Sequence, residues 1–88
     1  MAYEVRMAST AVRDLATIPP RYAATILEFI YAVLPEDPQR VAKPLERDLE
    51  GSHSARRGDY RVIYEIHDDS GDVLATGVNH RASVYRLR

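Results

Sequence analysis

Three arginines lie within six residues of one another in this chain: Arg56, Arg57 and Arg61. A guanidinium is a planar fork of hydrogen-bond donors that suits bidentate contact with a phosphate or a carboxylate. Gathering several guanidiniums on one surface costs roughly 1 kcal/mol for each close pair in wet surroundings. An anion bound between them offsets that cost, so the cluster indicates a phosphate-binding surface. The alternative is a solvated set, paired with the nearby carboxylates of Asp59, Glu65 or Asp72.

The whole chain does not share this cationic character. Its 88 residues carry a formal net charge of −1, with 45% hydrophobic and 28% charged residues. This composition is typical of one small globular domain spanning residues 1–88, and it gives no general attraction to nucleic acid. Arginine outnumbers lysine eleven to one, the single lysine being Lys43. A GC-rich genome also produces such a bias.

Several classes of site and location are disfavoured by what the sequence lacks. The absence of cysteine excludes disulfides and thiolate zinc sites, and it fits a reducing cytoplasm. His53, His67 and His80 have no close metal-ligand spacing, so we expect neither a metal nor a cofactor. No run approaches the ~20 apolar residues of a membrane span, so we expect a cytoplasmic protein without membrane contact.

The first part of the chain is predicted to form one strand and two helices. Residues 3–7 alternate between apolar and polar and predict a strand. Ser9 or Thr10 is a candidate N-cap for a short helix over residues 11–16, which Pro19-Pro20 ends. Apolar residues at helical spacing predict a second helix over residues 21–34.

The second half of the chain changes to a period of two. Residues 39–48 are compatible with a short amphipathic helical turn carrying Val41 and Leu45. We expect strands at 53–57, 60–68 and 73–81, with turns at 58–59 and 69–72, and a short last strand or tail at 83–87. The fold class is therefore α+β, in which an N-terminal strand and a helical hairpin pack on one face of an antiparallel sheet.

Strand alternation divides the candidate residues between two faces. Val62, Tyr64 and Ile66 are apolar and should meet the helices, which leaves Arg61 on the opposite face with Ile63 and Glu65. Ser54 and Arg56 share one parity on the preceding strand, and a short turn would bring Arg56 near Arg61. A meander of three strands would add Arg81 and Tyr85 to the same surface.

Two segments of the chain form a recognisable motif: LERDLEGSHSARRGDYRVIYEI (residues 45–66) and GVNHRASVYR (residues 77–86). The most specific part is the run Gly-Asp-Tyr-Arg-Val-Ile-Tyr-Glu followed by His-Arg-x-x-x-Tyr-Arg. On these residues, the sequence resembles the RelE/ParE superfamily of bacterial toxins. The amino-acid sequence of these segments is most similar to that of RelE members from actinobacteria. The β-α-α-β-β-β order and the length also match, so the resemblance covers essentially the whole chain.

The resemblance implies the toxin component of a type II toxin–antitoxin system. Such a RelE-type toxin is a metal-independent endoribonuclease, an mRNA interferase that acts in the ribosomal A site. The ribose 2′-hydroxyl attacks the adjacent phosphate to give a 2′,3′-cyclic phosphate. The resemblance also implies a RelB-like antitoxin as partner, with operator DNA bound only through the antitoxin complex.

The resemblance further implies roles for individual residues. Arg61 would stabilise the phosphate, Arg81 would act near the leaving oxygen, and Tyr85 would stack on a base or accept a proton. The other residues expected to contact substrate are Ser54, Arg56, Arg57 and His80. Ser54 stands where better-studied members carry a lysine thought to act as base. His80 has a suitable intrinsic pKa for a base near pH 7, although a structural role is the alternative, while alternation turns His53 to the other face.

Two alternatives to RNA cleavage share this fold. One is a ParE-like inhibitor of DNA gyrase without nuclease activity, and the other is a degenerate member kept for antitoxin binding and operon autoregulation. The combination of Arg61, Arg81 and Tyr85 favours cleavage. The sequence pI of about 6.3 is low for a protein that approaches ribosomal RNA.

Overall fold

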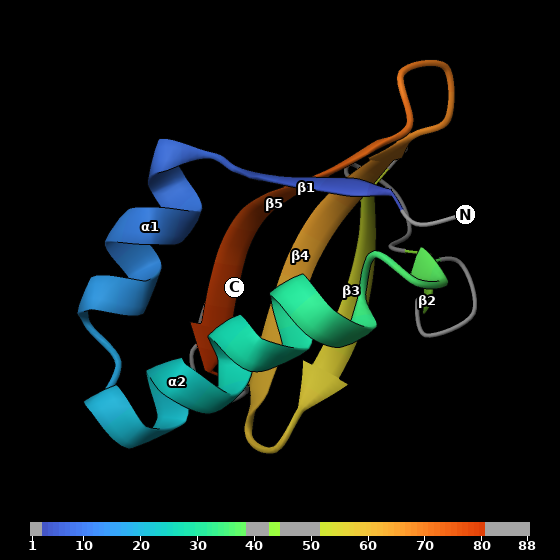
Figure 1. Cartoon of the computed structure of the whole chain (residues 1–88). Coiled ribbons are helices and arrows are strands. Elements are labelled where there is room, and N and C mark those ends of the chain that lie inside the picture. The colour runs from blue at the N-terminus through green and yellow to red at the C-terminus, as the bar shows by residue number, and fades with distance from the viewer. Residues whose placement is uncertain (1–2, 39–42, 45–51, 81–88) are drawn as a thin grey trace.

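The chain folds as the α+β arrangement that the residue pattern predicts, with its helices first and most of its strands last. We describe residues 3–38, 43–44 and 52–80 from a computed structural model (Figure 1). The elements in chain order are β1 (Glu4–Met7), α1 (Ser9–Ala16), α2 (Pro20–Glu28), a π-helical turn η1 (Phe29–Val33), β2 (Lys43–Pro44), β3 (Ser52–Arg57), β4 (Tyr60–His67) and β5 (Asp72–His80).

The sheet is mixed rather than wholly antiparallel. Its strand order is β1-β5-β4-β3-β2, and β1 pairs in parallel with β5, while the other pairs are antiparallel. Parallel pairing is available to β1 because a long connection containing both helices, rather than a tight turn, separates it from the rest of the sheet. The α+β class is confirmed. The expectation of a wholly antiparallel sheet is wrong, because β1 runs parallel to β5.

Two tight turns set the register of the β3-β4-β5 meander. Gly58 has φ of +62° and Gly71 has φ of +75°, in a region that residues with a Cβ rarely adopt. The first turn, Gly58-Asp59, places Arg57 opposite Tyr60 and Arg56 opposite Arg61. The strands expected at 53–57 and 60–68 are confirmed to within one residue at each end, and so is the start of the strand expected at 73–81, whose last residue lies outside the described residues.

The first helix lies along the part of β5 that extends beyond β1. The Ala8 backbone N–H donates to the Ala75 carbonyl, the Thr10 hydroxyl donates to the Thr76 carbonyl, and the Val78 N–H donates to Asp14 Oδ2 at 3.0 Å. The expected side-chain N-cap from Ser9 or Thr10 is therefore wrong. The helix begins at Ser9, with Ala8 as its N-cap and no side-chain cap hydrogen bond. The Thr10 hydroxyl donates to the edge of the sheet instead of capping the helix.

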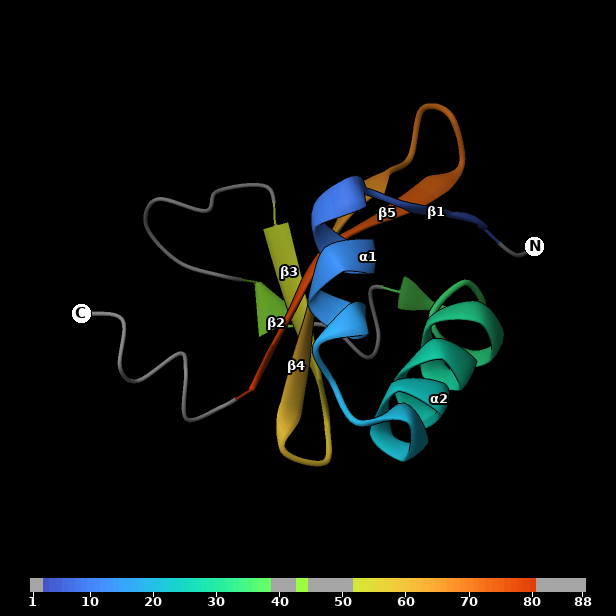
Figure 2. The ribbon, with the colours of Figure 1, turned by 90° about the vertical axis from the view of Figure 1, so that its left-hand side faces the viewer.

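The core lies between α2 and one face of the sheet, as Figure 2 shows from the side. Val62 and Tyr64 are inaccessible to solvent, and Ile66 packs against the same cluster, so the predicted inward face of β4 is confirmed. The Tyr64 hydroxyl donates to the Pro38 carbonyl at 2.7 Å, which satisfies a polar group inside the core. The helix-side cluster is completed by Leu15, Ile26, Phe29, Ile30, Leu34, Ala55, Val73 and Val78.

Two other predictions agree with the structure only in part. The second helix does not continue as one α-helix to residue 34, since its last turn is the π-helical turn Phe29–Val33. Lys43–Pro44 forms the short strand β2 where a helical turn was expected, because its backbone pairs with β3. The rest of residues 39–48, and the expected strand at 83–87, lie outside the described residues. Within the described part, no helix is long and apolar enough to cross a membrane.

Candidate functional site

The face of the sheet opposite α2 carries two arginines in direct opposition. Arg56 of β3 and Arg61 of β4 are register partners, a placement in which like charges repel one another. Among the described residues, neither guanidinium lies within ion-pair distance of a carboxylate. Asp72 instead pairs with Arg6 at 3.5 Å and Glu65 with His67 at 2.9 Å. The pairing of these arginines with neighbouring acids, which the sequence left open, is therefore absent from this part of the structure.

The same face includes Ser54 and Ile63, which are also register partners. Ser54 is only 9% exposed, so it is largely covered although it belongs to this face. On its other side, Ser54 pairs with Lys43 of β2. The sequence pattern contained no signal for this pairing, because β2 is only two residues long.

A β-bulge brings the end of β5 onto this face. The register between β4 and β5 shifts between Ile63 and Tyr64, so that the inward-facing residues of β5 change from odd to even positions along the strand. Asn79 consequently pairs with Arg61. We call Ser54, Arg56, Arg61, Ile63 and Asn79 the arginine face.

Two of the predicted substrate contacts, Arg57 and His80, lie away from the arginine face, on the side of α2. Arg57 alternates with Arg56, and its guanidinium lies 4.9 Å from the centroid of the Phe29 ring. His80 pairs with Tyr60 in the sheet, and their rings meet edge to face at 5.0 Å. The cluster of three arginines seen in the sequence is thus divided between the two faces.

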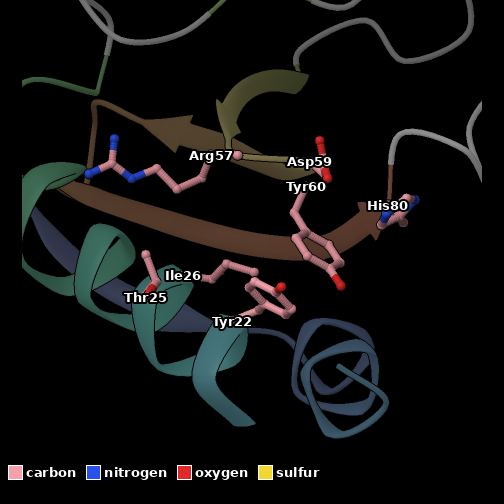
Figure 3. Close-up of a pocket in the computed structure, with 8 residues that line it drawn as sticks. Tyr22, Thr25, Ile26, Arg57, Asp59, Tyr60 and His80 are labelled. Carbon is pink, nitrogen blue, oxygen red and sulfur yellow. The ribbon is translucent and has the colours of Figure 1, made fainter. Parts of the chain in front are cut away.

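These two residues line a hollow between α2 and the β3-β4 turn (Figure 3). Its volume is about 630 Å³. The Tyr22 ring of α2 and the Tyr60 ring of β4 approach to 6.0 Å between centroids. We call this hollow the helix-side groove; it is lined by Tyr22, Thr25, Ile26, Arg57, Gly58, Asp59, Tyr60 and His80. A neighbouring hollow of about 360 Å³ shares Tyr60 and His80 with it.

His53 has the structural position that alternation predicts. It lies on the inward side of β3, where its ring stacks on Tyr64 at 5.9 Å between centroids. Its Nδ1 is buried without a hydrogen-bond partner in the part of the chain that the structure describes. Burial also raises the pKa of the Tyr64 hydroxyl above its ordinary value, which keeps this core group neutral.

The remaining expected site residues, Arg81 and Tyr85, lie outside the described residues. The described strand β5 ends at His80, immediately before Arg81. Within the described ranges, no cluster of three or more His, Asp or Glu side chains is arranged to hold a metal ion. The chemistry available on the described part of the arginine face is therefore anion binding by guanidinium groups.

Comparison with known proteins gives one consistent family. The family described as "ParE toxin of type II toxin-antitoxin system, parDE" matches residues 5–85. Toxin RelG of Mycobacterium tuberculosis is 49% identical over 86 residues, covering 98% of this chain and 99% of that protein. Toxin RelE of the same organism is 46% identical over 85 residues, covering 97% of this chain and 88% of that protein.

Solved structures give the same picture of the fold. The RelBE2 toxin–antitoxin complex of M. tuberculosis contains a chain with a TM-score of 0.88 and 47% identity, covering 92% of this chain and all of that one. A chain of the archaeal RelE–RelB complex from Pyrococcus horikoshii has a TM-score of 0.64 and 26% identity, covering 92% and 97%.

Proposed function

This chain belongs to the ParE toxin family of type II toxin–antitoxin systems, and from that membership we propose that it is a RelE-type toxin that cleaves messenger RNA on the ribosome. The observation that carries the proposal is the direct opposition of Arg56 and Arg61 without a carboxylate partner among the described residues. A bound phosphate stabilises such a pair, because it supplies oxygens to both guanidinium groups.

In the proposed reaction, the ribose 2′-oxygen bonds to the adjacent phosphorus while the bond from phosphorus to the 5′-oxygen breaks. A proton leaves the 2′-hydroxyl, and one is gained by the 5′-oxygen, giving a 2′,3′-cyclic phosphate and a 5′-hydroxyl. Arg61, with Arg56 beside it, holds the non-bridging phosphate oxygens. Charge that develops in the transition state is the charge that fixed donors stabilise most effectively.

The residues that follow β5 complete the proposed site. Arg81 acts near the leaving oxygen, and Tyr85 stacks on a base or assists proton transfer. The ribosome aligns the nucleotide for in-line attack, and alignment of this kind can contribute several kcal/mol without a protein base. Arg57 and His80 are left out of this set, because they lie on the other side of the sheet.

We also propose the cellular setting that the family membership favours. The partner is a RelB-like antitoxin, as in the complexes to which this fold is similar. Operator DNA is bound only through the complex with the antitoxin, and the protein acts in the cytoplasm at the ribosomal A site.

Single-turnover cleavage of a message on programmed ribosomes tests the reaction. Arg61→Ala should slow cleavage by about 10²-fold or more, as removal of one charge-stabilising donor does in other enzymes. The matched control is Arg13→Ala, which removes an exposed arginine from α1 and should leave the rate unchanged. Free RNA should not be cut, and the mapped products should carry a cyclic phosphate. Equal rates for Arg61→Ala and the parent would exclude the phosphate role.

A second candidate function is inhibition of DNA gyrase without nuclease activity. It is favoured by the description of the matched family, which names the ParE toxin. Gyrase-dependent DNA breaks, without any cleavage of messages, would establish this function instead. If neither activity is found but the antitoxin still binds, the chain is a member kept for antitoxin binding and operon autoregulation.

A further inference from the structure

The helix-side groove combines features that the proposed cleavage reaction does not use. Its floor includes the buried side chain of Ile26, and its walls carry the Tyr22 and Tyr60 rings (Figure 3). Tyr22 is 44% exposed, which is unusual for a large aromatic side chain beside an apolar floor. A hollow of about 630 Å³ lies within the range of volumes that specific ligands or partner side chains occupy.

Two guanidinium groups lie at or beside this groove: Arg57 is one of its lining residues, and Arg21 contacts the lining residue Tyr22. Arg57 lies over the Phe29 ring, and Arg21 lies 4.9 Å from the centroid of the Tyr22 ring, with its Nη2 3.3 Å from the Tyr22 hydroxyl. Within the described residues, neither guanidinium forms an ion pair with a carboxylate. Contacts to aromatic faces are weaker than charge-assisted hydrogen bonds to a carboxylate, so both groups favour an acidic partner.

The position of the groove argues against RNA as its occupant. The arginine face and the groove lie on opposite sides of β3 and β4, because Arg56 and Arg57 are successive residues of a strand. A nucleotide held at Arg61 therefore does not place its own base between Tyr22 and Tyr60. The Asp59 carboxylate also lines the groove, where it is an acceptor for the backbone N–H groups of a bound peptide.

We propose that the helix-side groove is the place where the cognate antitoxin docks an acidic segment. An apolar or aromatic side chain of that segment fills the space between Tyr22 and Tyr60, and flanking carboxylates pair with Arg21 and Arg57. This inference rests on the proposed toxin–antitoxin function, although it does not depend on whether the target is messenger RNA or gyrase. It assigns antitoxin recognition and phosphate binding to opposite faces of one hairpin.

The test measures the dissociation constant of the complex with the purified cognate antitoxin for two pairs of matched variants. Arg57→Glu should weaken binding at least tenfold, whereas Arg13→Glu, an equal charge reversal on α1, should change it less than threefold. Tyr22→Ala should weaken binding at least tenfold, whereas Tyr31→Ala should not, although Tyr31 is 55% exposed. Arg57→Gln is the milder variant if Arg57→Glu does not fold, and thermal melts of each variant alone establish that it is folded.

Two further measurements make the assignment specific. Hydrogen exchange of the complex should show protection in residues 20–28 and 57–60. Replacing an acidic residue of the antitoxin segment by lysine should restore binding to Arg57→Glu.

The outcomes that would contradict the proposal are distinct. If Arg57→Glu and Tyr22→Ala bind the antitoxin like the parent, or protection is confined to the arginine face, the proposal is overturned. If Arg57→Glu loses message cleavage but keeps antitoxin binding, the groove belongs to RNA. Loss of cleavage by Arg61→Ala with unchanged antitoxin affinity would support both proposals, whereas a parent without any nuclease activity would overturn only the function.

Discussion

The Tyr64 hydroxyl is a polar group in the middle of the core, and it makes the free energy of unfolding depend on pH in the alkaline range. The ring is inaccessible to solvent, and burial raises the pKa of the hydroxyl above its ordinary value of 10.0. The unfolded chain therefore loses this proton at a lower pH than the folded chain does. The stabilising contribution is present below pH 10, and it is lost as the pH rises through the folded-state pKa, by up to about 1.4 kcal/mol for each pH unit.

Urea titrations between pH 8 and pH 11 measure this effect. Tyr64→Phe should remove most of the alkaline loss in the free energy of unfolding. Tyr3 contributes in the same direction, since its hydrogen bond to Asp68 raises its pKa. Tyr31→Phe, a change at an exposed position, should leave the pH dependence as it is in the parent. An alkaline loss in Tyr64→Phe as large as that of the parent would contradict this account.

Helix α1, rather than another strand, lies along the free edge of β5. The Asp14 carboxylate accepts the backbone N–H of Val78, a residue that is only 5% exposed. Asp14→Ala leaves this buried donor without its partner. We therefore expect the free energy of unfolding to fall by about 1–3 kcal/mol, measured by urea denaturation.

The conservative variant and the neighbouring residue provide the comparison. Asp14→Asn retains an acceptor oxygen and should cost less than Asp14→Ala. Arg13→Ala changes the adjacent exposed residue and should have little effect on stability. If Arg13→Ala and Asp14→Ala destabilised the protein equally, the loss would reflect helix propensity rather than protection of the sheet edge.

The elements also show which parts of the structure the sequence could predict. The opposition of Arg56 and Arg61 was predictable, because a glycine turn and strict alternation determine both register and face. The parallel direction of β1 was not, since nothing in residues 3–7 specifies the direction of the partner strand. The bulge in β5 was hidden as well, because its small residues fit either face. The helix-side groove depends on three separated segments meeting, which no local pattern encodes.

A domain of 88 residues has a small margin of stability, so a bound partner should change its free energy of unfolding measurably. An antitoxin that binds only the folded state adds about 2.7 kcal/mol when its free concentration is 100 times the dissociation constant. For a domain of this size, that gain corresponds to a rise of roughly 10–20 °C in Tm. Melts at increasing cognate antitoxin concentration measure the rise, and a non-cognate antitoxin is the control. A Tm independent of the cognate antitoxin concentration would argue against specific binding to the folded chain.

The sheet order has a consequence for how the chain is made. The strand between β1 and β4 is β5, which is also the last described strand to be synthesised. Until it leaves the ribosome, β1 has no partner in the sheet, α1 has no edge to cover, and the isolated β3-β4 hairpin is at best marginally stable. At about 5–20 residues per second, β5 follows α2 by several seconds. The arginine face, which includes Asn79 of β5, is therefore assembled only after β5 has joined the sheet, well after α2 has been synthesised.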